Sequence, residues 1–364
     1  MNTEITQTTN FLNNKIKTRN YIKSTLVLSA ILLGCLSVKS QTTYTFTNCN
    51  QTGAQGPTQV QVDAAYSATN LNGMVTINTQ GIQEWVVPVT GNYSIDVFGA
   101  QGGTGGGNAG GLGANMTGEF ALTAGQVIQI IAGQIGVLNA GSGSNDSGPG
   151  GGGSFVVDLA TGNPIIIAGA GGGGGRLSPG SDGVTTETGT DGNGTNPGLG
   201  GLNGGGGGSG RDGLAGNGMT PGGNGASCSY GAGGAGFFSR GGYNCSGSAP
   251  LIAGFEFASG AMGGTGDVAR GGTDGGFGGG AGSGHRASGG GGYSGGGGNG
   301  SSEGGGAGGS FNSGTNQTNT AGVNSGNGLV TITTPCDVVG TSTVMNSNDN
   351  GPGSLRDLVS GSCR

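Results

Sequence analysis

The stretch from Gly263 to Gly309 constrains the fold of this chain more than any other. It carries few large apolar side chains, and charge is also sparse. Disordered linkers stay open because they are polar and charged, so this stretch needs partners for its backbone amides. Glycine lacks a Cβ, and left-handed helices with three residues per turn point their N–H and C=O groups sideways. We therefore predict a bundle of polyglycine II helices that hydrogen-bond to one another.

The composition separates this prediction from ordinary disorder. The 364 residues include 96 glycines and 10 prolines, a level typical of low-complexity chains, so the competing interpretation is a flexible Gly-rich linker. Only 8% of the residues are charged, which is too few for ordinary disorder. There is no strict G-X-Y period, which excludes collagen. The formal net charge of −6 gives no basic surface for nucleic acid.

Residues 1–40 have the form of an export signal. Basic residues between Lys15 and Lys23 precede an apolar stretch, Ser24–Val38, that is too short to span a bilayer comfortably. Val38 and Ser40 stand at positions −3 and −1 of a plausible signal-peptide cleavage site before Gln41. The alternative is a lipobox that leaves a lipid anchor on Cys35. Both interpretations predict a secreted or cell-surface protein, with no membrane span in the mature chain.

Export favours disulfides among the remaining cysteines. Cys49 is left over once the best-spaced cysteines are paired, and connectivity cannot be deduced from sequence. The candidate pairs are Cys228 with Cys245 and Cys336 with Cys363.

Short alternating apolar segments frame the glycine runs at both ends. Trp85, the only tryptophan, is predicted to fill the core, and residues 53–69 to form a loop with room for a short helical turn. We predict strands at 43–49, 75–78, 82–89, 93–97, in a hairpin within 118–136, in a second hairpin within 155–168, and at 327–334. This order predicts an antiparallel sandwich from which Gly-rich segments emerge and return.

The same segments carry a family resemblance. VPVTGNYSIDVFGAQGG (Val87–Gly103), the 118–136 hairpin, GGGGSFVVDL and the closing GNGLVTIT stand in one characteristic order. In these residues the chain resembles the glycine-rich extracellular domain of the anaplastic lymphoma kinase and leukocyte tyrosine kinase receptors, and bacterial glycine-rich proteins like it. The match spans about Phe46 to Thr334. It implies a jelly-roll-like β-sandwich with polyglycine helices in a hexagonal array, in a region that faces ligand in the receptors.

Two departures limit what the resemblance implies. No kinase domain and no membrane-spanning segment follow these motifs, so signalling is not expected to carry over. The receptor cysteine pattern is not evidently kept, so the receptor ligands are not expected to carry over either. We predict a signal peptide at 1–40, a glycine-rich domain at 41–334, and the start of a truncated β-helix-like module at 335–364. The tail segment Asn346–Val359 resembles the NDSGPGSLR repeat of bacterial surface β-helices.

The sequence contains no recognisable catalytic or cofactor-binding motif. His285, the only histidine, lies in GSGHRAS, where a loop position is the simpler interpretation. The sequence has no Cys-x-x-Cys pair to form a zinc site. No G-K-[ST] follows a glycine run, so there is no Walker phosphate-binding loop. The aspartates in the glycine runs miss the calcium nonapeptide spacing. We therefore predict no enzyme, no cofactor and no metal.

Aromatic residues beside the glycine runs have two interpretations. They either cover the polyglycine helices or form a recognition patch for a protein or glycan ligand. The candidates are Phe237, Phe238, Tyr243 and Tyr293. The leading hypothesis is a non-catalytic structural, adhesion or recognition module at the cell surface. The alternatives are a carbohydrate-binding or hydrolytic accessory module of a larger surface protein, and a flexible linker.

The predicted amide pairing has a direct test. Backbone N–H groups between Gly263 and Gly309 are expected to exchange with deuterium far more slowly than those of a free peptide, because each one is hydrogen-bonded. Hydrogen exchange followed by mass spectrometry measures this. Exchange at free-peptide rates, together with rapid trypsin cleavage at Arg240 and Arg286, would instead identify a linker.

Overall fold

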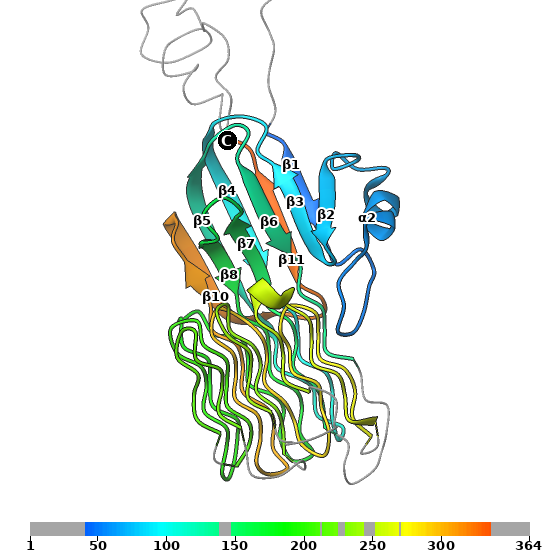
Figure 1. Ribbon diagram of the computed structural model, residues 1–364, viewed down its shortest axis with the longest axis vertical. Helices are drawn as coiled ribbons and strands as arrows, with labels where there is room; N and C mark the ends of the chain where they lie inside the picture. Colours follow the sequence, from blue (N-terminus) through cyan, green and yellow to red (C-terminus); the bar gives the residue numbers. More distant parts are fainter. Residues whose placement is uncertain are drawn as a thin grey trace, which may run out of the picture. The chain divides into compact units, whose positions relative to one another are not determined.

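The computed structural model describes residues 41–137, 147–211, 213–224, 230–243, 252–268 and 271–335. Within these ranges the chain from Thr42 to Pro335 forms one compact unit. A β-sandwich makes up one part of this unit, and closely packed glycine-rich segments make up the other (Figure 1). The predicted signal peptide and the tail from residue 336 onward lie outside the described residues.

Two antiparallel sheets build the sandwich in the described part of the chain. The first has the order β1-β11-β4-β5-β10. Its strands are β1 (Thr43–Phe46), β4 (Gly91–Phe98), β5 (Gly113–Leu122), β10 (Thr315–Asn324) and β11 (Leu329–Thr333). The second has the order β2-β3-β6-β7-β8-β9. Its strands are β2 (Val75–Thr79), β3 (Ile82–Val86), β6 (Val127–Ile131), β7 (Ser154–Asp158), β8 (Pro164–Ala168) and β9 (Phe311–Asn312). The predicted all-β antiparallel sandwich is confirmed.

The core lies between the two sheets because apolar side chains alternate along the strands. Tyr93, Ile95 and Val97 of β4 are fully buried, as their spacing predicts. Trp85 of β3 is also fully buried, and its ring centroid lies 5.0 Å from that of Tyr44. The Trp85 indole N–H is buried without a hydrogen-bond partner. The burial and ring contacts of this large side chain offset that unsatisfied donor.

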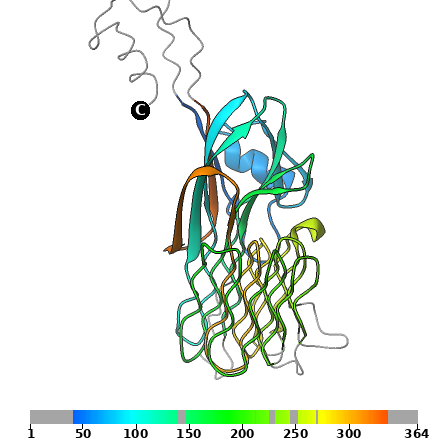
Figure 2. The same cartoon turned by 90° about the vertical axis from the view of Figure 1, so that its left-hand side faces the viewer.

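The glycine-rich segments continue the strands, and we call these extended segments rods (Figure 2). The chain leaves β4, β6 and β8 to enter rods, and it returns from rods into β5, β7 and β9. Serine hydroxyls complete the hydrogen bonds at these junctions. Ser154 Oγ accepts from the N–H of Gly133 at 2.9 Å and donates to the C=O of Phe98 at 2.6 Å. One hydroxyl thereby joins three chain segments where sheet pairing gives way to rod pairing.

Successive amides of the rod at residues 169–175 donate in three different directions. The fourth donor returns to the same neighbouring rod as the first, so the direction repeats every three residues. This is the period of a polyglycine II helix. The bonds run from Gly171 to Ala100 (3.0 Å), from Gly172 to Ser181 (2.9 Å), from Gly173 to Ser288 (2.9 Å) and from Gly174 to Gly103 (2.9 Å).

The carbonyls of the same rod accept from three further rods. The rod therefore has six neighbours, three that accept from it and three that donate to it, which is a hexagonal array. The predicted polyglycine helices are present in the arrangement that the family resemblance implies. The accepting bonds run from Gly151 to Gly171 (3.0 Å), from Gly111 to Gly172 (2.9 Å) and from Gly305 to Gly173 (2.8 Å).

This array requires glycine because carbonyl oxygens occupy the positions that side chains would need. A Cβ on Gly171 would lie 1.8 Å from the oxygen of Gly111, and a Cβ on Gly173 would lie 1.9 Å from the oxygen of Gly148. Both oxygens belong to backbone, so neither can rotate away. Flexible-linker behaviour is incompatible with this packing.

Three elements differ from what the sequence predicts, and one of them is the two-residue strand β9, which lies where no strand is predicted. The helix α2 (Gln59–Tyr66) has eight residues where only a short turn is expected, and it buries Val62 and Tyr66. The strand β10 is absent from the predicted strands because its sequence, TNQTNTAGVN, has no apolar alternation. It forms through backbone pairing with β5, with Thr315 opposite Glu119 and Thr318 opposite Thr117. A short 3₁₀ turn at Phe257–Ser259 completes the described elements.

The requirement for glycine predicts the effect of one added methyl group. Gly173→Ala is expected to destabilise the protein by about 1–3 kcal/mol or more, because backbone must move to admit the Cβ. Chemical unfolding followed by circular dichroism measures the change. Gly284→Ala is the matched control, since its Cβ would meet only the Asp267 side chain at 3.6 Å. Equal stability of the two variants would contradict the proposed role of close rod packing.

Candidate functional site

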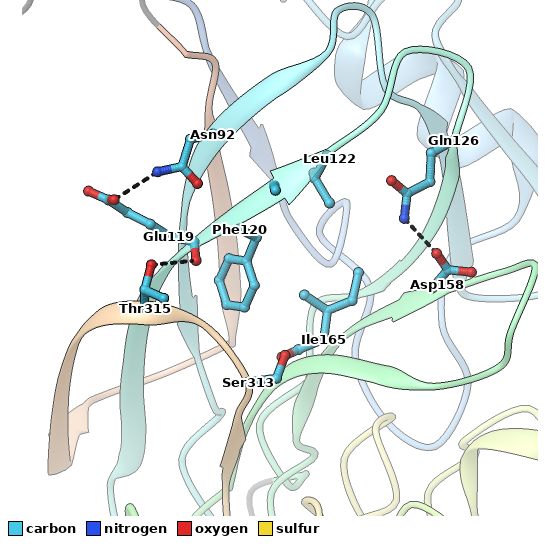
Figure 3. A pocket seen from close by; sticks show the side chains of 10 residues that line it. Asn92, Glu119, Phe120, Leu122, Gln126, Asp158, Ile165, Ser313 and Thr315 are labelled. Carbon is cyan, nitrogen blue, oxygen red and sulfur yellow. Dashed lines mark hydrogen bonds between the residues drawn. The ribbon is translucent and has the colours of Figure 1, made fainter.

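A pocket of about 370 Å³ opens at one corner of the sandwich. β9 pairs with β8 in the second sheet, whereas β10 pairs with β5 in the first. Ser313 and Gly314 therefore carry the chain from one sheet to the other beside the pocket. We call this pocket the corner cleft, and it is shown in Figure 3. The residues that line it include Asn92, Glu119, Phe120, Leu122, Gln126, Asp158, Ile165, Ser313 and Thr315.

Strand geometry separates the apolar and polar side chains that border the corner cleft. Phe120 and Leu122 lie on the buried side of β5, whereas Glu119 lies on the opposite side. The Phe120 ring points into the middle of the cleft (Figure 3). The crossing chain comes close to this ring, since a Cβ on Gly314 would lie 2.6 Å from it. A larger residue at position 314 would push the ring aside.

The polar side chains form two amide–carboxylate pairs, one on each side of Phe120 (Figure 3). Asn92 Nδ2 donates to Glu119 Oε2 at 2.8 Å. Gln126 Nε2 donates to Asp158 Oδ2 at 2.5 Å. These bonds hold the planar groups in fixed orientations at the rims of the cleft. Lys, Arg and His do not occur among the described residues that line it.

The pKa of the Asp158 carboxyl lies below its ordinary value. Burial acts to raise the pKa of its carboxyl, but hydrogen bonds outweigh this effect and leave the pKa below its ordinary value. The donors are the backbone N–H of Thr161, at 2.9 Å, and the side-chain amide of Gln126. The cleft therefore carries a fixed negative charge from β7 across the neutral and mildly acidic range.

The predicted aromatic patch divides between buried and exposed side chains. Phe237 and Tyr293 are only 4% and 9% exposed, and they pack between the rods and the second sheet. The Phe237 ring stacks on Phe155 of β7, with centroids 6.3 Å apart. Phe238 is 37% exposed and touches Phe237 edge-on. Tyr243 lies apart from them, against a different apolar cluster. The structure therefore brings three of the four residues together.

The cysteines contribute no described disulfide. Cys49 is a free, buried thiol that donates to the C=O of Thr47 at 3.7 Å, and burial raises its pKa. A buried thiol with a raised pKa is a poor nucleophile. The predicted disulfide residues lie outside the described ranges, so their pairing stays a prediction; they are Cys228, Cys245, Cys336 and Cys363.

Aspartates in the glycine runs bind backbone amides. Asp182 accepts from the N–H of Leu112 at 2.7 Å, and Asp274 accepts from that of Gly266 at 2.8 Å. The described residues contain no group of three or more His, Cys, Asp or Glu side chains placed to hold a metal ion. These carboxylates accept hydrogen bonds from backbone amides of the glycine-rich segments.

A search of the described helices for a membrane span found none of sufficient length and apolarity.

The sequence does not show that Glu119 and Asp158 line one cleft. Glu119 and Asp158 are recognisable as acidic residues on or beside predicted strands. Their proximity to one cleft depends on the corner at Gly314, and that corner precedes the unpredicted strand β10. A polar Asn- and Thr-rich segment between the last glycine run and the predicted strand at 327–334 was the available signal.

Comparison with known proteins gives one partial relationship. A stretch of 110 residues, 29% of the chain, is 36% identical to part of the extracellular region of the leukocyte tyrosine kinase receptor of Mus musculus. The matched stretch is 12% of the receptor's length, so most of the receptor has no counterpart in the match. No protein-family model matches the chain. The findings support a distant relation to that extracellular region.

The lowered pKa of Asp158 predicts a pH-dependent contribution to stability. Its ionised form is stabilised in the folded state, so this contribution is present above the unfolded pKa, about 3.9, and is lost as pH falls through the lower folded pKa. Wild type is therefore expected to exceed Asp158→Asn in stability at pH 7, with the difference shrinking below about pH 4. Thermal melts across this range measure it. A difference that does not change with pH would exclude the carboxylate as its source.

Proposed function

We propose that this protein is a secreted or cell-surface recognition module without catalytic activity. The observation that carries the proposal is the hexagonal rod array, which continues directly from the strands of the sandwich. The rod at residues 169–175 is hydrogen-bonded to six neighbours, and we infer from this that rods and strands form one stiff body. The distant relation to a receptor's extracellular region supports an extracellular role.

The rigid body has a consequence for binding. A surface that is already ordered loses little conformational freedom when a ligand binds, and preorganisation of this kind favours affinity. The corner cleft lies on the sandwich, whose strands are continued by the rods. We propose that the rods act as a stiff mount and that the sandwich presents the ligand-binding surface. The exposed ring of Phe238 is a second candidate contact on the rod side.

A carbohydrate-binding or hydrolytic module is the alternative function. The two carboxylates of the corner cleft favour its binding form, because acidic and amide side chains hydrogen-bond well to hydroxyl groups. Nothing in the cleft assigns one carboxylate as acid and the other as base or nucleophile. The hydrolytic form therefore has less support than the binding form.

The proposal is tested by measuring retention and turnover on the same surfaces. The full chain is applied to cellulose, chitin, xylan and collagen, and both bound protein and released reducing sugar are measured. We expect retention on at least one surface with no sugar released. Failure to bind any of the four would overturn the recognition role. Sugar release that disappears in Glu119→Gln or Asp158→Asn would overturn the non-catalytic assignment in favour of the hydrolytic alternative.

A further inference from the structure

The turn between α2 and β2 contains a chemically labile pair of residues. Asn72 is followed by Gly73, and both are exposed. The carbonyl carbon of an asparagine side chain can be attacked by the backbone nitrogen of the next residue, with formation of a cyclic imide. Glycine leaves this nitrogen unshielded because it has no Cβ. Asparagine counts among the thermolabile residues, and an Asn-Gly pair is its most reactive setting.

The residues on either side hold the turn, but the Asn-Gly pair itself is free. Leu71 is only 1% exposed, and its C=O accepts from the N–H of Met74 at 2.9 Å. Within the part of the chain that the structure describes, the side-chain amide of Asn72 has no hydrogen-bond partner, and neither has the N–H of Gly73. The electrophile and the nucleophile are therefore both available in this turn.

The other Asn-Gly pairs of the described chain are held by hydrogen bonds. Six such pairs have both residues within the described ranges, and the pair at Asn72 is one of them. At Asn327, Oδ1 accepts from the N–H of Ile135 at 2.9 Å, and the N–H of Gly328 donates to the C=O of Gly133 at 2.8 Å. Reaction at a held pair requires these bonds to break first. The held pairs begin at Asn193, Asn203, Asn217, Asn299 and Asn327.

We propose that Asn72 is the residue at which this folded protein undergoes spontaneous deamidation. The backbone nitrogen of Gly73 attacks Cγ of Asn72 and loses its proton to water. The bond between Cγ and the side-chain nitrogen breaks, and this nitrogen leaves as ammonia. Water then opens the cyclic imide at one of its two carbonyls, which gives aspartate or isoaspartate. Solvent water is the co-reactant, and no electrons are transferred.

The products change the charge and the backbone of the turn. Aspartate and isoaspartate each add one negative charge at neutral pH. Isoaspartate also routes the main chain through the side-chain carbon, which lengthens the connection between Leu71 and Met74. This modification is independent of the recognition role proposed above, because it uses only residues of the turn.

Peptide mapping by mass spectrometry tests the proposal on the full chain. The protein is incubated in mildly alkaline buffer, folded or in urea, and the deamidated fraction is measured at each Asn-Gly pair. In urea the pairs are expected to convert at comparable rates, because each has the same two residues and none is held. In the folded protein Asn72 is expected to convert about tenfold or more faster than the other described pairs, the effect of one hydrogen bond that must break elsewhere.

Two variants separate the roles of the two residues. Asn72→Ser is expected to abolish the mass gain at this position and to leave the other pairs unchanged. Gly73→Ala is expected to slow conversion at Asn72, because the added Cβ shields the attacking nitrogen. That Cβ would meet no atom within 4 Å, but the φ of +70° strains alanine, so melting curves establish that the variant is folded. Asn72→Ser serves alone if it is not.

Three outcomes would overturn the proposal. The first is faster conversion, in the folded protein, at any of the described pairs that are held. The second is an Asn72 that converts in urea but stays unmodified in the folded protein. The third is unchanged conversion in folded Gly73→Ala, which would exclude the Gly73 nitrogen as the attacking group. Retention on the surfaces named above is measured separately, so its failure or success does not bear on this result.

Discussion

The sideways hydrogen bond between polyglycine rods is the interaction on which the rest of this structure depends. Each bond contributes only about 0.5–1.5 kcal/mol net, but a buried amide left without one is costly. The bonds form because carbonyls of neighbouring rods approach to positions that a Cβ would occupy, as at Gly171 and Gly173. The array is therefore specified by the absence of side chains. Where side chains reappear, as at Ser154, their hydroxyls complete the same network.

The sequence predicts much of this fold, for reasons that also define its limits. Alternation predicts strands such as β4, since a half-buried strand needs apolar residues at every second position. Short apolar runs around a turn predict β7 and β8. The rods are predicted because the backbone amides of the glycine runs need hydrogen-bond partners. β10 escapes prediction because backbone pairing and exposed Asn and Thr residues leave no periodic pattern. Which rods become neighbours also escapes prediction, because glycine carries no side chain to encode a partner. Ala100 and Ser288 border one rod from segments far apart in sequence.

The candidate site shows the same division between local and long-range information. Glu119 and Asp158 are visible as individual acidic residues, but their joint use depends on a chain crossing at Gly314. The predicted aromatic patch had recognisable members, yet burial separates their roles. Phe237 and Tyr293 hold the rods against the second sheet, whereas Phe238 retains exposed surface. Side-chain type thus indicated the candidate residues, and the topology determined which of them are exposed.

The rod array also has a consequence for the temperature dependence of stability. Unfolding of most domains exposes apolar side chains, which raises the heat capacity and curves the free energy of unfolding against temperature. Unfolding of the rods exposes peptide groups instead, and polar exposure lowers the heat capacity. The rods therefore flatten the stability curve that the sandwich alone would have. A protein built in this way keeps a more even margin against both cold and heat than a purely apolar core of equal size provides.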